Sequence, residues 1–71
     1  MKTTYRAYDG HFHFELLNGS THVEPAERVD HPQTVCEIMD KAVTLSSYER
    51  WSLVNMLTSY ELTETMKRRY R

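Results

Sequence analysis

Histidine and glutamate side chains occupy every second position from His11 to Glu15, a spacing that could bind a metal ion. His11, His13 and Glu15 are two residues apart. On a β-strand such side chains project from one face, and imidazole and carboxylate groups are ligands that Zn²⁺ and Fe²⁺ use. The hairpin register predicted below adds His22 opposite Glu15. A solvent-facing sheet surface explains the same residues and provides no pocket around a metal, so we expect no metal and no other cofactor.

Nucleophilic and phosphate-binding chemistry has little support. Cys36 is the single thiol, and no histidine stands near it at a spacing typical of a Cys/His pair. We expect Cys36 to be a small buried hydrophobic residue. The two glycines, Gly10 and Gly19, belong to predicted turns and leave none for a phosphate-binding loop. The sequence therefore predicts a protein that is not an enzyme.

A basic run with an interleaved aromatic residue ends the chain. It consists of Lys67, Arg68, Arg69, Tyr70 and Arg71. Such a run can neutralise phosphates and stack on a base, which predicts binding to nucleic acid as an alternative function. The competing explanation is that cations in a last helical turn complement the helix dipole, and that Glu64 pairs with Lys67 or Arg68. We favour this second explanation.

Two turn dipeptides organise the N-terminal third of the chain. Asp9-Gly10 and Asn18-Gly19 are favoured residues of two-residue β-hairpin loops, in which both central residues have positive φ. Loops of that length predict a three-stranded antiparallel meander over about 3–8, 11–17 and 20–24. They also set the register, in which Tyr5 faces Phe14 and Phe14 faces Val23.

This register separates the side chains into an apolar face and a polar face, because successive residues of a strand alternate. The predicted core face carries Tyr5, Ala7, Phe12, Phe14, Leu16 and Val23. We expect the opposite face to bind another protein, because Tyr and Arg are enriched at interface hot spots. Its predicted partner-binding residues are Arg6, Tyr8, His11, His13, Glu15, Leu17, His22 and Glu24.

Helices follow the meander. Asp30 is a candidate cap, Pro32 suits a first helical turn, and the apolar residues from Val35 recur at helical spacing. Ser46 and Glu49 form a capping box. A similar pair, Thr58 and Glu61, favours a break near Thr58 over one long helix. The sequence predicts an α+β fold with two or three helices, at about 32–44, 47–57 and 59–70, packed on one face of the sheet.

Length and charge narrow the function classes. The 71 residues allow one domain, residues 1–71, with a small core. The net charge of −1 combines −4 over residues 1–40 with +3 over residues 41–71. No apolar run could span a membrane, and one cysteine favours a reducing compartment, so we expect a cytoplasmic protein.

These features predict a small regulator or inhibitor that binds another protein. Short proteins of this kind are typical of phages and other mobile elements, where they act on host proteins. Both outer strands of the predicted sheet are free edges, and an open edge can pair with a second copy. Trp51 and Tyr60 could also contribute to a homodimer.

Overall fold

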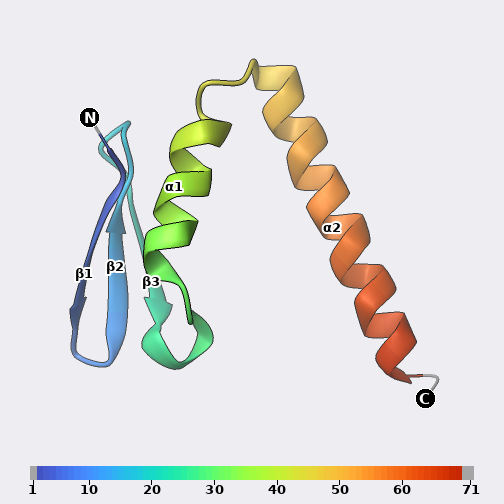
Figure 1. Cartoon of the computed structure of the whole chain (residues 1–71), viewed down its shortest axis with the longest axis horizontal. Coiled ribbons are helices and arrows are strands. Elements are labelled where there is room, and N and C mark those ends of the chain that lie inside the picture. The colour runs from blue at the N-terminus through green and yellow to red at the C-terminus, as the bar shows by residue number, and fades with distance from the viewer. Residues whose placement is uncertain (1, 70–71) are drawn as a thin grey trace.

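The computed structural model describes residues 2–69 and shows a three-stranded antiparallel sheet followed by two helices (Figure 1). The predicted α+β class is confirmed. In chain order the elements are β1 (Thr4–Tyr8), β2 (His11–Glu15), β3 (Thr21–Pro25), the 3-10 turn η1 (Ala26–Arg28), α1 (Pro32–Ala42) and α2 (Ser47–Arg69). Neither helix is both long and apolar enough to cross a membrane, within the part of the chain that the structure describes.

The hairpin of β1 and β2 has the predicted register. Tyr5 pairs with Phe14 and Tyr8 pairs with His11. Asp9 and Gly10, the two loop residues, have φ of 53° and 73°. Two consecutive positive φ values match a type I′ turn, whose twist follows that of the strands.

The second hairpin is shifted by one residue from the predicted register, so this prediction is wrong. Phe14 pairs with His22 instead of Val23. The loop has three residues, because Leu16 N–H donates to the carbonyl of Ser20 at 2.8 Å and Gly19 N–H donates to that of Leu16 at 3.0 Å. Only Gly19 in this loop has positive φ, at 87°. A type I turn closed by a left-handed glycine is the usual three-residue solution, and the Asn-Gly pair did not reveal it.

The shift exchanges the faces of β3. Val23 lies on the face of His13, and His22 and Glu24 lie on the face of Phe14 and Phe12. A slip of one residue has this effect because the side-chain period of a strand is two. The predicted places of His22 and Glu24 on the polar face, and of Val23 in the core, are therefore wrong.

Helix α1 covers the face of the sheet that carries Phe14. Phe14 and Cys36 are 4% and 1% exposed. Asp40 fixes the helix to the N-terminal segment, since its Oδ1 accepts hydrogen bonds from Thr3 N–H at 2.8 Å and from Thr3 Oγ1 at 2.5 Å. Pro32 occupies the first turn as predicted, but the cap position belongs to His31 rather than Asp30, and no side chain caps it.

Helix α2 begins at the predicted capping box and is unbroken. Glu49 N–H donates to Ser46 Oγ at 3.2 Å, and Ser46 N–H donates to Glu49 Oε1 at 2.9 Å. The predicted break near Thr58 does not occur. Thr58 Oγ1 instead donates to the carbonyl of Val54 at 2.9 Å, four residues back in the same helix.

The place of α2 differs from the prediction that both helices pack on the sheet. In Figure 1 it descends on the far side of α1 and diverges from it, and it touches the rest of the described chain only sparsely. Nothing in its sequence directs one apolar stripe to the sheet, because apolar residues occur on opposite sides of the helix.

Candidate interaction surfaces

The face of the sheet opposite α1 is open. β1 and β2 contribute five of the predicted binding residues to it: Arg6, Tyr8, His11, His13 and Glu15. β3 adds Thr21 and Val23, which the shifted register brings to this side. We call these seven residues the open face. Cross-strand pairing holds their backbones in one rigid surface.

A stacked pair stands at the centre of the open face. The rings of Tyr8 and His13 are parallel within 3°, with centroids 3.8 Å apart. Nε2 of His13 is buried and has no hydrogen-bond partner in the described part of the chain. His11 is held separately, since its Nδ1 donates to the carbonyl of Asp9 at 2.7 Å. The sheet therefore presents a fixed aromatic pair with one unsatisfied polar atom.

A shallow depression of about 340 Å³ surrounds this pair. Arg6, Glu15 and Val23 are among the residues that line it. Tyr8 and Val23 are about half exposed. The depression thus combines a cation, a carboxylate and apolar surface, a mixture suited to contact with a protein.

The other predicted residues of this surface lie elsewhere. His22 Nε2 and Glu24 Oε1 are 2.7 Å apart along β3, on the side of the sheet that α1 covers. Leu17 is exposed in the three-residue loop. The four candidate metal ligands therefore do not share a face, and residues 2–69 contain no group of three or more His, Cys, Asp or Glu that could hold a metal ion.

A groove between α1 and α2 is a second candidate surface. Its volume is about 490 Å³. The apolar residues that line it are Ile38, Met39, Ala42 and Val43 from α1, and Trp51, Leu53, Val54 and Leu57 from α2. Sequence reasoning missed this groove because it placed both helices against the sheet.

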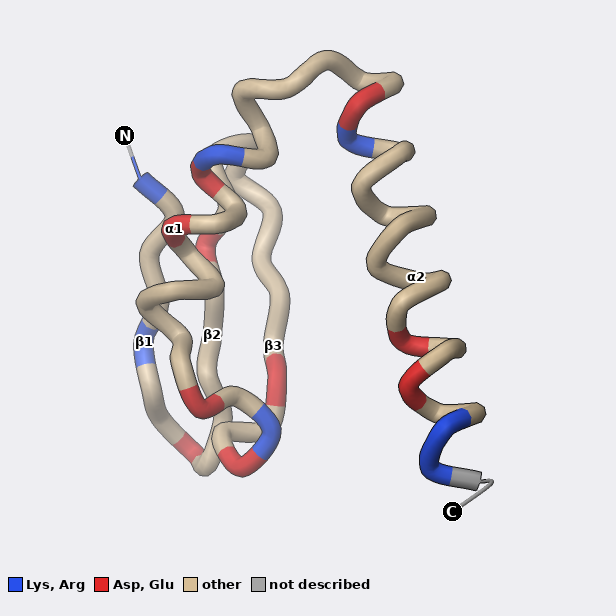
Figure 2. The backbone as a smooth tube through the Cα atoms, turned by 45° about the vertical axis from the view of Figure 1, so that its right-hand side comes forward, with Lys and Arg blue, Asp and Glu red and all other residues tan. Residues whose placement is uncertain are grey.

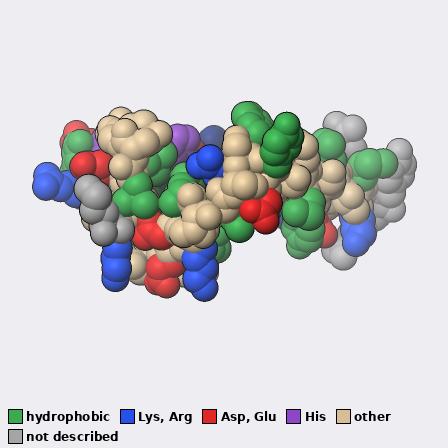
Figure 3. Space-filling view, turned by 90° about the horizontal axis from the view of Figure 1, so that it is seen from above, with side chains coloured by type: hydrophobic (Ala, Val, Ile, Leu, Met, Phe, Trp, Pro, Cys, Tyr) green, Lys and Arg blue, Asp and Glu red, His purple; other side chains and the backbone are tan. Residues whose placement is uncertain are grey.

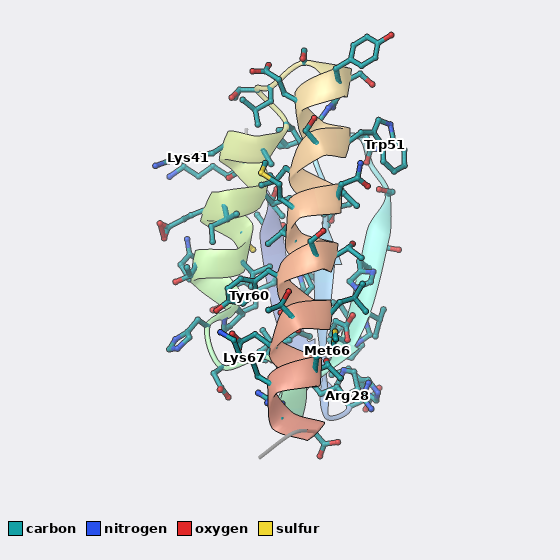
Figure 4. The ribbon with its side chains drawn as sticks, turned by 90° about the vertical axis from the view of Figure 1, so that its right-hand side faces the viewer. Arg28, Lys41, Trp51, Tyr60, Met66 and Lys67 are labelled. Atoms are coloured by element: carbon teal, nitrogen blue, oxygen red, sulfur yellow. The ribbon has the colours of Figure 1, made fainter. Side chains whose placement is uncertain are left out.

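Large apolar side chains also stand at the surface on the outer side of α2. Tyr48, Leu62 and Met66 are exposed there. Figure 3 shows hydrophobic side chains at the surface along this helix, and in Figure 4 Trp51 projects to the opposite side from Tyr60 and Lys67. In the sequence, the apolar residues of α2 fall on opposite sides of a helix, a pattern that one buried stripe does not explain.

The basic end of the chain is only partly described. Lys67 and Arg68 are exposed in the last turns of α2. The predicted ion pairs of Glu64 with these residues do not form. The side chain of Arg69, and Tyr70 and Arg71 altogether, lie outside the described residues.

Among the residues that the structure describes, three ionisable groups have shifted pKa values. Burial raises the pKa of the Cys36 thiol, and the carboxylates of Asp40 and Glu37 raise it further. The pKa of Asp40 lies below its ordinary value, chiefly because of the hydrogen bonds from Thr3. That of Glu49 is lowered by the hydrogen bonds of the capping box. Cys36 is thus a buried neutral thiol, far from a reactive thiolate.

Comparison of the chain with protein-family models, with curated proteins and with solved structures finds no match in any of the three.

Proposed function

We propose that this chain is a small non-enzymatic regulator or inhibitor that binds another protein through the open face, with the phage or mobile-element type as its setting. The observation that carries this proposal is the Tyr8–His13 stack with its unpaired buried Nε2. The proposal includes action in the cytoplasm, which the free, buried Cys36 supports.

The unpaired nitrogen favours a protein partner that supplies a hydrogen-bond group. A buried polar group without a partner costs about 1–3 kcal/mol, so a complex in which the His13 ring turns and exposes Nε2 to a hydrogen-bond group of the partner recovers that free energy. Arg6 lines the same depression and can bind a carboxylate or carbonyl of the partner. Tyr8 supplies rigid apolar contact area with little loss of side-chain entropy.

Differential capture tests this proposal. The full chain and three single variants, Arg6→Ala, Tyr8→Ala and His13→Phe, are immobilised and exposed to extract of the source cells. His13→Phe retains an aromatic ring against Tyr8, removes both ring nitrogens and enlarges the ring by one atom. We expect a protein that the wild type retains and that each variant binds about 5- to 150-fold more weakly, corresponding to roughly 1–3 kcal/mol.

Gln33→Ala provides the matched control, because Gln33 is exposed on α1 rather than on the sheet. This variant should capture the same protein with unchanged affinity. Thermal unfolding of every variant verifies that the fold is intact. If folded open-face variants capture the same proteins as the wild type with equal affinity, the open face is not the binding surface.

Binding to nucleic acid is the second candidate, because Lys67 and Arg68 stand exposed at the far end of α2 (Figure 2). It predicts an affinity for DNA or RNA that falls steeply as salt rises, and that is lost when residues 67–71 are removed. Absence of binding at low salt excludes this function.

A further inference from the structure

The chain exposes far more surface than a compact protein of its size. Its accessible surface is 6424 Å². A compact monomer of 8.5 kDa exposes about 4,700 Å². The radius of gyration is 14.3 Å, against about 11 Å for a compact domain of this length. About 1,700 Å² per chain is therefore in excess of what a compact monomer exposes.

Helix α2 carries many of the exposed large apolar side chains and touches the rest of the described chain only sparsely. An isolated helix is marginally stable in water unless tertiary contacts cover its apolar side. α2 has 23 residues, and apolar side chains line the groove toward α1 without filling it. The apolar side chains of α2 therefore remain largely exposed within a single chain.

We propose that two copies of this chain associate through α2. The two helices lie antiparallel about a twofold axis between Leu57 and Thr58, and the α2 of each copy occupies the groove between α1 and α2 of the other. The contact strip on α2, here called the seam, consists of Glu49, Leu53, Leu57, Tyr60, Glu64 and Lys67. Their spacing of three and four residues places them on one side of a helix.

The charges at the ends of α2 are complementary to those of a second, antiparallel copy. Glu49 and Lys67 lie nine residues on either side of Thr58, so each faces the other residue of the second copy. Arg50 and Glu64 lie seven residues on either side of Leu57 and meet in the same way. In Figure 2 the charged residues lie toward the two ends of α2 and leave an uncharged middle.

This self-complementarity selects a second copy over an unrelated protein. A twofold interface requires one patch to match itself, with opposite charges placed symmetrically about the axis. An antiparallel pair also opposes the two helix dipoles favourably. A parallel pair would instead place Glu49 beside Glu49 and Lys67 beside Lys67.

The excess accessible surface of each chain is as large as the area that an obligate dimer buries. Obligate homodimers bury about 2,000–5,000 Å² in total, or roughly 1,000–2,500 Å² per chain. The excess surface of this chain falls within that range. Because the seam and the groove are remote from the open face, a dimer presents two open faces, and the proposal does not rest on the function proposed above.

Sedimentation equilibrium of the full chain tests the dimer with a matched pair of variants. Leu57 and Leu62 are 58% and 61% exposed on the same helix, but only Leu57 belongs to the seam. The wild type should have twice the chain mass of 8.5 kDa at about 100 µM. Leu57→Glu should weaken dimerisation at least about 100-fold, whereas Leu62→Glu should remain dimeric.

A charge exchange tests the antiparallel arrangement. Arg50→Glu and Glu64→Arg should each weaken dimerisation about 3- to 10-fold at low salt, because each places like charges together. The double variant restores opposite charges and should return the dissociation constant to near that of the wild type. Rescue by the second substitution excludes misfolding as the cause of the first effect.

Three results would overturn the proposal. A wild type that stays at the mass of one chain excludes the dimer. If Leu57→Glu and Leu62→Glu weaken dimerisation equally, the contact does not lie on the seam. A dimer whose double charge variant is no tighter than the single variants contradicts the antiparallel register.

Discussion

At the scale of single residues, two carboxylates stabilise the structure, and local sequence pattern reveals only one of them. Glu49 stands three residues after Ser46, and the capping box is visible from that spacing. Asp40 binds Thr3, which is 37 residues away in the chain. Contacts over such separations depend on tertiary packing, so local pattern does not reveal them.

Asp40 should make stability dependent on pH. Its folded-state pKa lies below the unfolded value of about 3.9, so its contribution is complete above that value and is lost as pH falls through the folded-state pKa. We expect Asp40→Ala to be less stable than the wild type at neutral pH, with the difference shrinking toward zero in strong acid. Urea unfolding over this pH range measures it.

Glu49 provides a control for that experiment because its pKa is also lowered. Glu49→Gln should remove only its own part of the acid dependence and leave that of Asp40. If Asp40→Ala and the wild type lose stability in parallel down to strong acid, the Thr3–Asp40 hydrogen bonds do not stabilise the fold.

At the scale of elements, the second hairpin shows where sequence reasoning succeeds and fails. The existence of β2, the loop and β3 follows from alternation and Asn18-Gly19. The register does not follow from the sequence, because Asn-Gly occurs both as a two-residue loop and at the last two positions of a three-residue loop. One residue, Leu17, decides between them, and with it the face that His22 and Val23 occupy.

Deletion of Leu17 tests this explanation. The shortened loop would consist of Asn18 and Gly19 between Leu16 and Ser20, which is the favoured two-residue hairpin loop. We expect the pairing of Phe14 with His22 to persist and stability to change by less than about 1 kcal/mol. Cross-strand nuclear Overhauser effects measure the register.

The opposite result would be equally clear. If the deletion brings Phe14 opposite Val23 in the original numbering, the register is set by side-chain packing and not by the loop. Gly19→Ala in the full-length loop supplies a second measurement. It should destabilise the hairpin by roughly 1–2 kcal/mol, because Gly19 has φ of 87°.

Helix α2 should depend on its N-terminal cap more than a packed helix does. Ser46→Ala removes the acceptor for Glu49 N–H and should cost about 1 kcal/mol of helix stability. Far-UV circular dichroism under conditions that favour single chains should show reduced helix content. Ser52→Ala, within the helix, should leave helix content unchanged or slightly higher; an equal loss from both variants would show that the cap is unimportant.

At the scale of the whole molecule, the length predicted one domain with a small core. The sheet and α1 form that core around Phe14 and Cys36. α2 stands outside it, and sequence patterning did not place this helix because its apolar residues do not form one stripe. Within α2, the charged residues lie where they can face opposite charges of an antiparallel second copy.

We expect a second copy to cover α2, and amide hydrogen exchange at two protein concentrations measures that cover. A helix that a second copy covers exchanges slowly only when the dimer is populated. We predict that dilution from about 100 µM to well below the dimer dissociation constant will speed exchange in α2, while the sheet and α1 change little. Exchange in α2 that is independent of concentration would show that no second copy covers this helix.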